Sequence, residues 1–274
     1  MPAMSFDLQR ARQLLPGVIE LAAAAGREIM AVYSGDFTVT AKADHSPLTA
    51  ADLASQHTIA AGLARLTPDI PMLGEESAAA EVAAHRSWTT LWLVDPLDGT
   101  REFVKRNGEF TVNIALVHEH DAILGVLHAP VAGSSYAAVR GQGAWCIEAD
   151  GRQRSIRVQR PAAVPPRVLG SRSHRGRTLD RLLDRLGEHQ LLSVGSALKF
   201  GWLAEGRADF YARPGPTSEW DTAAGQIIVE EAGGRVVDFE GRPLRYNARE
   251  TLTNPSFAAW ADDAHDWLAL LREG

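Results

Sequence analysis

Apolar residues in the first 33 positions recur at the spacing of one helix face. They are Leu8, Ala11, Leu14, Leu15, Val18, Ile19, Ala22 and Ile29. This spacing predicts a long helix, and Pro16 is expected either to kink it or to begin its main part. A second amphipathic pattern runs from Thr49 towards Leu66, where Thr49 and Asp52 have the spacing of a capping box. The chain is therefore expected to open with two helices.

Short apolar runs follow, separated by Gly, Pro and Asp, and their length and β-branched content favour strands. The predicted strands are residues 70–73, 91–94, 111–117, 122–127, 136–139 and 155–158. The four polar residues 118–121 indicate a hairpin, and Gly141-Gln-Gly143 indicates another turn. Helices packed on a largely antiparallel sheet, an α+β arrangement, fit this half of the chain.

The pattern changes at the proline-rich stretch 161–166, which is typical of a linker. Beyond it, strands and helices alternate. Strands are predicted at residues 168–169, 191–194, 208–211 and 236–237, and helices at 178–186, 197–205 and 222–232. Alternation of this kind favours an α/β layer with crossover helices. We predict an α+β domain over residues 1–160, an α/β domain over residues 161–274, and a cleft between them.

Composition narrows the class of protein. With 274 residues, of which 45% are hydrophobic, and a net charge of −6, the chain can bury a core and is not of the disordered class. No apolar run approaches the ~20 residues of a membrane-spanning helix. The acidic balance argues against a nucleic-acid polymer as partner. The N-terminal residues do not resemble a signal peptide, so a cytoplasmic location is expected, and peripheral inner-membrane association stays open.

Cysteine and histidine offer little chemistry. A single cysteine, Cys146, can form no internal disulfide and no cysteine-based zinc site. His118 and His120 are close together, but no third ligand lies nearby, so we interpret them as polar residues of the hairpin.

The strongest candidate chemistry lies directly after the predicted strand 91–94, in Asp95-Pro-Leu-Asp98-Gly-Thr100. Pro96 is expected to end the strand pairing and bring Asp98 back beside Asp95. Paired carboxylates with a free carbonyl suit Mg²⁺, which prefers oxygen ligands and keeps positions open for a substrate. The alternative is an ordinary Asx turn with a helix-capping aspartate.

Two other acidic segments strengthen the metal interpretation. Gly74-Glu75-Glu76-Ser77 follows the strand 70–73, and Glu219-Trp220-Asp221 precedes the helix 222–232, where Asp221 has the alternative role of N-cap. Carboxylates ~4 Å apart repel each other by about 4 kcal/mol at an effective dielectric constant of ~20. Acids gathered in one cleft would therefore need either protons or cations.

These three segments together resemble the magnesium-dependent, lithium-sensitive phosphatase superfamily that includes inositol monophosphatase and fructose-1,6-bisphosphatase. The similarity spans residues 14–257, and it implies a layered α/β/α/β/α sandwich. It is closest to the bacterial 3′(2′),5′-bisphosphate nucleotidases, which act in sulfur metabolism. The segments that carry this closer resemblance are residues 42–47, 101–114, 171–174 and 195–200.

The resemblance implies two or three Mg²⁺ ions in the active site. Glu75, Asp95 and the Leu97 carbonyl would hold one ion, and Asp95, Asp98 and Asp221 a second. Thr100, paired with Asp52, would orient and deprotonate a metal-bound water. The backbone of Asp98, Gly99 and Thr100 would hold the phosphate that is cleaved, and the metal ligands Glu75, Leu97 and Asp221 would border the substrate. Thr100 and Asp52 have the alternative role of helix caps.

In the nucleotidases, positions that resemble His174, Ser196, Lys199 and Arg213 hold the remaining phosphate and the nucleoside. The implied reaction converts adenosine 3′,5′-bisphosphate to AMP and phosphate, with a small nucleotide bisphosphate as partner and a monomeric or homodimeric enzyme. Lys199 has the alternative role of a surface lysine and Arg213 that of a solvated loop cation. Alternative functions are an inositol or other sugar monophosphatase with the same metal chemistry, and a catalytically silent nucleotide-binding sensor.

Overall fold

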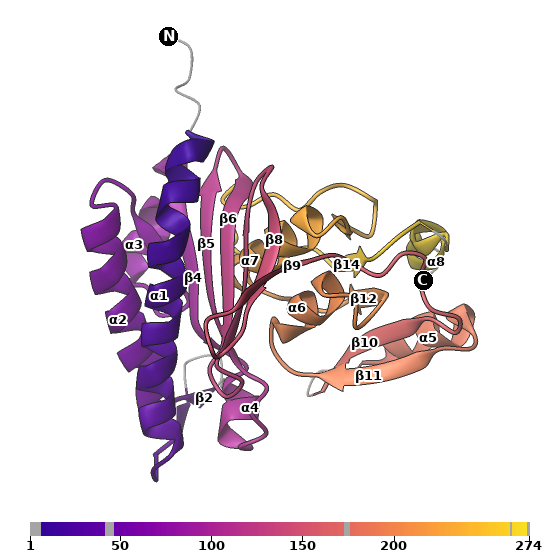
Figure 1. Cartoon of the computed structure of the whole chain (residues 1–274), viewed down its shortest axis with the longest axis horizontal. Helices are drawn as coiled ribbons and strands as arrows, with labels where there is room; N and C mark the ends of the chain where they lie inside the picture. The colour runs from indigo at the N-terminus through magenta and orange to yellow at the C-terminus, as the bar shows by residue number, and fades with distance from the viewer. Residues whose placement is uncertain (1–6, 42–46, 173–175, 264, 273–274) are drawn as a thin grey trace.

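The computed structural model describes residues 7–41, 47–172, 176–263 and 265–272, which form five stacked layers (Figure 1). Helices α1 (Leu8–Tyr33) and α2 (Ala50–Leu66) cover one face of a seven-stranded sheet. Helices α6 (Leu198–Ala204) and α7 (Glu219–Glu231) lie between this sheet and a five-stranded one. Helices α5 (Arg177–Leu186) and α8 (Trp267–Arg272) pack on the far face of the second sheet. The predicted α/β/α/β/α sandwich is confirmed.

The seven-stranded sheet is antiparallel except for its first pair, whereas the sequence predicted only that the sheet is largely antiparallel. Its order follows the chain: β3 (Met72–Gly74), β4 (Thr90–Asp98), β5 (Thr111–His118), β6 (Asp121–Ala129), β7 (Ser134–Val139), β8 (Gly143–Ile147) and β9 (Gln153–Ile156). The β5–β6 hairpin turns at Glu119 and His120, which both have positive φ. His118 forms a hydrogen bond with the Thr90 hydroxyl, and His120 forms one with the Tyr246 carbonyl. Strand β8 was not predicted.

The prediction that Pro96 ends strand pairing was wrong. Strand β4 pairs with β5 up to Asp95, bulges, and pairs again at Asp98. Pro96 falls within the bulge, where no ladder hydrogen bond requires its missing N–H. Its carbonyl accepts a hydrogen bond from Ser55 Oγ on α2 at 2.6 Å. The bulge, rather than the end of the strand, is what brings Asp95 and Asp98 together.

The five-stranded sheet has the order β11-β10-β12-β14-β13. Its strands are β10 (Arg167–Ser171), β11 (Gln190–Val194), β12 (Phe210–Arg213), β13 (Arg235–Asp238) and β14 (Phe257–Trp260). β10 is parallel to β11 and β12, whereas β14 is antiparallel to β12 and β13. The short stretch that forms β14 was not predicted as a strand, because only its burial between two partners distinguishes it from a loop.

Both N-terminal helices form as the sequence predicted. Pro16 lies inside α1, which continues through it and begins at an Asp7 N-cap. The Thr49 side chain caps α2 by accepting from Ala51 N at 3.2 Å, and Asp52 completes the capping box. Three short elements, α3 (Ala79–Ala84), η1 (His85–Ser87) and α4 (Thr100–Val104), and a two-stranded ribbon, β1 (Thr40–Ala41) with β2 (Pro47–Leu48), join the larger ones. None of the helices described is both long and apolar enough to cross a membrane.

Helix α7 begins three residues earlier than predicted, so Ser218 and not Asp221 is its N-cap residue. The helix packs closely on β6, where Gly125 leaves no room for a side chain. A Cβ atom there would lie 2.5 Å from Ile227 Cγ2 and 2.7 Å from the Ala224 carbonyl. This contact fixes the height of α7 above the seven-stranded sheet. The domain division at residue 160 stays a prediction, since α6 and α7 lie between the two sheets.

Candidate active site

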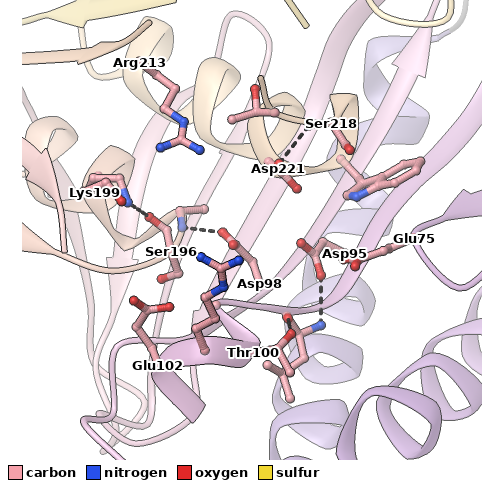
Figure 2. A pocket seen from close by; sticks show the side chains of 17 residues that line it. Glu75, Asp95, Asp98, Thr100, Glu102, Ser196, Lys199, Arg213, Ser218 and Asp221 are labelled. Carbon is pink, nitrogen blue, oxygen red and sulfur yellow. Dashed lines mark hydrogen bonds between the residues drawn. The ribbon is translucent and has the colours of Figure 1, made fainter. Parts of the chain in front are cut away.

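A cavity of about 410 Å³ lies where strand β4 ends, bordered by the starts of α4, α6 and α7 (Figure 2). Most of the residues that the sequence analysis singled out line it. They are Glu75, Asp95, Leu97, Asp98, Gly99, Thr100, Ser196, Lys199, Arg213 and Asp221. Segments more than a hundred residues apart in the chain thus meet in one place. His174 lies outside the described residues.

Backbone N–H groups orient three of the acids. Asp95 Oδ1 accepts from Leu97 N at 3.0 Å, and Asp221 Oδ2 accepts from Ser218 N at 2.8 Å. Asp98 Oδ2 accepts from Ala197 N at 2.5 Å and from Asn113 Nδ2 at 3.4 Å. Figure 2 shows the three carboxyl groups gathered around the same part of the cavity. Asp98 therefore joins the bulge of β4 directly to the start of α6.

Burial and mutual repulsion make these acids hard to ionise. The pKa of Asp95 is raised well above its ordinary value, first by burial and then by Glu75, Asp98 and Asp221. Burial and the Asp98 charge raise the pKa of Asp221 to about 8, although the hydrogen bond from Ser218 N opposes the shift. Burial also raises the pKa of Asp98, while the Lys199 charge opposes it. The cluster favours the uptake of positive charge, either as a proton or as a cation.

The donor set fits a hard divalent cation. It consists of carboxylates and a carbonyl, which are the ligands of Mg²⁺, and burial together with mutual repulsion raises the pKa values of Asp95 and Asp221. As placed, no three His, Cys, Asp or Glu side chains of the described residues stand together as a ready metal group. The acids share a cavity without converging on one point.

Thr100 and Asp52 form the predicted pair. Thr100 Oγ1 donates to Asp52 Oδ1 at 3.4 Å and is 3.3 Å from the Leu97 carbonyl. Asp52 Oδ2 accepts from Thr49 N at 2.8 Å and from Thr49 Oγ1 at 2.7 Å. Asp52 is buried behind Thr100 rather than lining the cavity. The capping role and the pairing role of Asp52 thus exist together, one on each carboxyl oxygen.

Positive charge lines the opposite end of the cavity. Lys199 is only 5% exposed, and its Nζ donates to the carbonyls of Ser196 at 2.5 Å and Val194 at 3.3 Å. Burial lowers the pKa of Lys199 to about 8, although the Asp98 charge opposes the shift. A surface role for Lys199 is therefore wrong. Arg213 also lines the cavity, and its buried Nε has no hydrogen-bond partner within the described part of the chain.

Sequence reasoning missed several residues of the site. Glu102, only 4% exposed, lines the cavity beside Arg101, and Ser171, Ala197, Thr217 and Ser218 complete its wall. Asn113 is buried beneath Asp98 and is itself held by Thr111 Oγ1 at 2.8 Å. Glu102 and Asn113 fall in the segment 101–114 that carries the family resemblance, but no local pattern marks them as neighbours of the acids.

Known proteins resemble the chain over most of its length. The model of the inositol monophosphatase family matches residues 10–272. The 3′(2′),5′-bisphosphate nucleotidase CysQ of Escherichia coli K12 is 51% identical over 247 residues, which cover 89% of this chain and 98% of that protein. CysQ of Haemophilus influenzae is 33% identical over 260 residues, covering 94% of this chain and 97% of that one.

Solved structures of proteins from the same family also resemble the chain. The crystal structure of CysQ from Bacteroides thetaiotaomicron, a bacterial member of the same family, superposes with a TM-score of 0.76 at 37% identity and covers 89% of this chain and 96% of that one. An inositol monophosphatase from Thermotoga maritima gives a TM-score of 0.77 at 28% identity, covering 93% of this chain and 95% of that one.

Proposed function

The chain belongs to the inositol monophosphatase family, and from this premise we propose that it is a Mg²⁺-dependent 3′(2′),5′-bisphosphate nucleotidase. It would convert adenosine 3′,5′-bisphosphate to AMP and phosphate. One observation carries the proposal: a single cavity brings together the acids Glu75, Asp95, Asp98 and Asp221 and the cations Lys199 and Arg213. The high identity to nucleotidases of this name supports the choice of substrate.

The acids would hold the metal ions. Glu75, Asp95 and the Leu97 carbonyl would hold one Mg²⁺, and Asp95, Asp98 and Asp221 would hold a second. Bound Mg²⁺ lowers the pKa of a coordinated water towards neutrality and offsets the charge of the leaving oxygen. Their raised pKa values support this role, because carboxyl groups that repel one another gain most from a shared cation.

Thr100 and Asp52 would handle the proton of the attacking water. The Thr100 hydroxyl lines the cavity while donating its own hydrogen to Asp52 Oδ1, so its lone pairs can accept a hydrogen bond from the water. As Thr100 Oγ1 accepts a proton from the water, Asp52 Oδ1 would receive the hydrogen that Thr100 Oγ1 donates to it. Gly99, with φ of +92°, lets the backbone of residues 98–100 come close to the phosphate.

The cationic end would hold the rest of the substrate. Ser196, Lys199 and Arg213, together with His174, are proposed to bind the 5′-phosphate and the nucleoside. The partnerless buried Nε of Arg213 supports an anion there, because a buried donor without an acceptor costs free energy that a phosphate oxygen would recover. A substrate with one phosphate at each end matches a cavity with metal ligands at one end and cations at the other.

Steady-state phosphate release tests the proposal. We expect kcat/KM for adenosine 3′,5′-bisphosphate to exceed that for inositol 1-phosphate by tenfold or more, and chelation to abolish release. A tenfold preference for inositol 1-phosphate would overturn the substrate and leave the metal chemistry. Equal release with Mg²⁺ and after chelation would overturn the metal chemistry. Binding of the nucleotide with no release would instead indicate a silent sensor.

A further inference from the structure

Glu109 does not line the cavity, yet it holds a turn that does. Its Oε2 accepts from Gly195 N at 2.8 Å. Arg172, which directly follows β10, grips both oxygens of the same carboxylate, through Nε at 2.6 Å and through Nη2 at 2.7 Å. Arg172 Nη2 also donates to the Ser193 carbonyl at 2.6 Å. One ion pair therefore joins the loop before β5 to the ends of β10 and β11.

Each residue of the turn 195–197 makes a hydrogen bond with a side chain. Ala197 N donates to Asp98, and Lys199 Nζ donates to the Ser196 carbonyl. A Cβ atom on Gly195 would lie 2.6 Å from Glu102 Cγ and 2.7 Å from the Glu109 carbonyl, so only glycine fits. Ser196 has φ of +48°, a conformation that persists only where surrounding contacts enforce it. The hydrogen bond from Gly195 N to Glu109 holds the backbone directly before Ser196.

The ion pair itself is a weak source of stability. The side chains of Arg172 and Glu109 are 43% and 21% exposed, and exposed pairs contribute little to the free energy of unfolding. The two hydrogen bonds from Arg172 do, however, hold the Glu109 carboxylate in one orientation, in which its Oε2 accepts from Gly195 N. The arrangement suits a positional role better than a stabilising one.

We propose that Glu109, oriented by Arg172, is a positioning residue that sets the turn 195–197 for binding the nucleotide. The inference rests on the proposed function, in which Ser196 and Lys199 contact the part of the substrate that is not cleaved. Losing Glu109 would let Ser196 relax from its positive φ and move the neighbouring Lys199. Nucleotide binding would then weaken. The bond from Ala197 N to Asp98 Oδ2 does not involve Glu109, so the phosphate-releasing step at the acids would change much less.

Glu109→Ala, Glu109→Gln and the matched control Asp69→Ala form the test. Asp69 makes a comparable two-bond contact with Arg10, at 2.9 Å and 3.0 Å, but does not border the cavity. We measure AMP binding by titration calorimetry, and KM and kcat for adenosine 3′,5′-bisphosphate. For Glu109→Ala we expect Kd and KM to rise about tenfold and kcat to stay within about threefold. Glu109→Gln, which keeps an oxygen for Gly195 N, should retain most of the affinity, and Asp69→Ala should retain all of it.

Arg172→Met alone, which should also weaken AMP binding, and the double variant Glu109→Ala/Arg172→Met add a coupling measurement. If Arg172 acts through Glu109, the double variant should bind AMP about as weakly as Glu109→Ala alone. Unchanged AMP affinity in Glu109→Ala, or a fall in kcat without a change in KM, would overturn the inference. Absence of phosphate release by the wild-type protein would refute the proposed function alone, because the calorimetric comparison of AMP binding would still decide the role of Glu109.

Discussion

Asp98 shows how one side chain can serve two parts of the site. One carboxyl oxygen accepts from Ala197 N and Asn113 Nδ2, and this ties strand β4 to the start of α6. Burial raises its pKa, and the Lys199 charge partly restores the ionised form. The same carboxylate therefore links the acids to the cationic end of the cavity. Its proposed role as a metal ligand makes a direct prediction.

Asp98→Asn should lower kcat by orders of magnitude, roughly 10³-fold, because the amide removes a charge from the proposed metal site. The metal-free variant should unfold at the same temperature as wild type or higher, because removing one charge relieves repulsion among buried acids. Phosphate release and thermal melts in chelator check both parts. A large drop in melting temperature would show that Asp98 is chiefly structural.

At the level of secondary structure elements, the site depends on how closely α7 packs against the seven-stranded sheet. Asp221 lies in the first turn of α7, and Gly125 on β6 sets how closely that helix approaches the sheet. The bulge in β4 has a corresponding role for Asp95 and Asp98. The positions of the acids are therefore set by packing between elements as well as by the motifs themselves.

Gly125→Ala should destabilise the protein by about 1–3 kcal/mol, because the added Cβ meets Ile227 and the Ala224 backbone well inside van der Waals contact. It should also lower kcat, because α7 must move with Asp221. Gly35→Ala is the control, since its nearest atom, the Val32 carbonyl, would be 3.8 Å away. Denaturant unfolding and phosphate release measure both effects. Equal stability of the two variants would contradict the proposed packing constraint.

Over the whole molecule, the buried acids couple folding to pH and metal. In the folded protein the pKa of Asp221 is about 8, against an ordinary value of 3.8. The folded state therefore binds this proton more tightly, and its contribution to stability falls as pH rises through this range. His128, whose pKa is lowered by burial to about 4, adds an opposite slope only below its ordinary value of 6.5. Between pH 6.5 and 8 the raised acids therefore set the slope, with Glu219 (pKa about 7) adding to the fall and Lys199 (pKa about 8) opposing it only near the upper end.

Metal-free protein should therefore melt at progressively lower temperature from pH 6.5 to pH 8. Mg²⁺ should raise the melting temperature more at pH 8 than at pH 6.5, because it competes with protons for the same carboxylates. Asp221→Asn should flatten the metal-free slope. Melts in chelator and in excess Mg²⁺ across this range provide the measurement. A metal-free melting temperature that rises with pH would contradict the prediction.

The sequence by itself determined the elements with strong periodicity and the segments that carry the acids. The helix over α1, the capped start of α2 and the strands before Asp95 follow from the local spacing of apolar residues and from capping chemistry. The three acidic segments were also visible, because residue types adjacent in the chain are enough to indicate a metal ligand set.

Only the tertiary structure decided how these segments meet. Local patterns could not show that Pro96 falls in a bulge, that Phe257–Trp260 completes a sheet, or that Ser218 is the N-cap of α7. They gave no sign that Glu109 reaches Gly195, 86 residues away. Such contacts depend on the free energy of burying whole surfaces together, which no short window of sequence contains. The sequence identifies the acids, but only the packing of the folded chain brings them into one cavity.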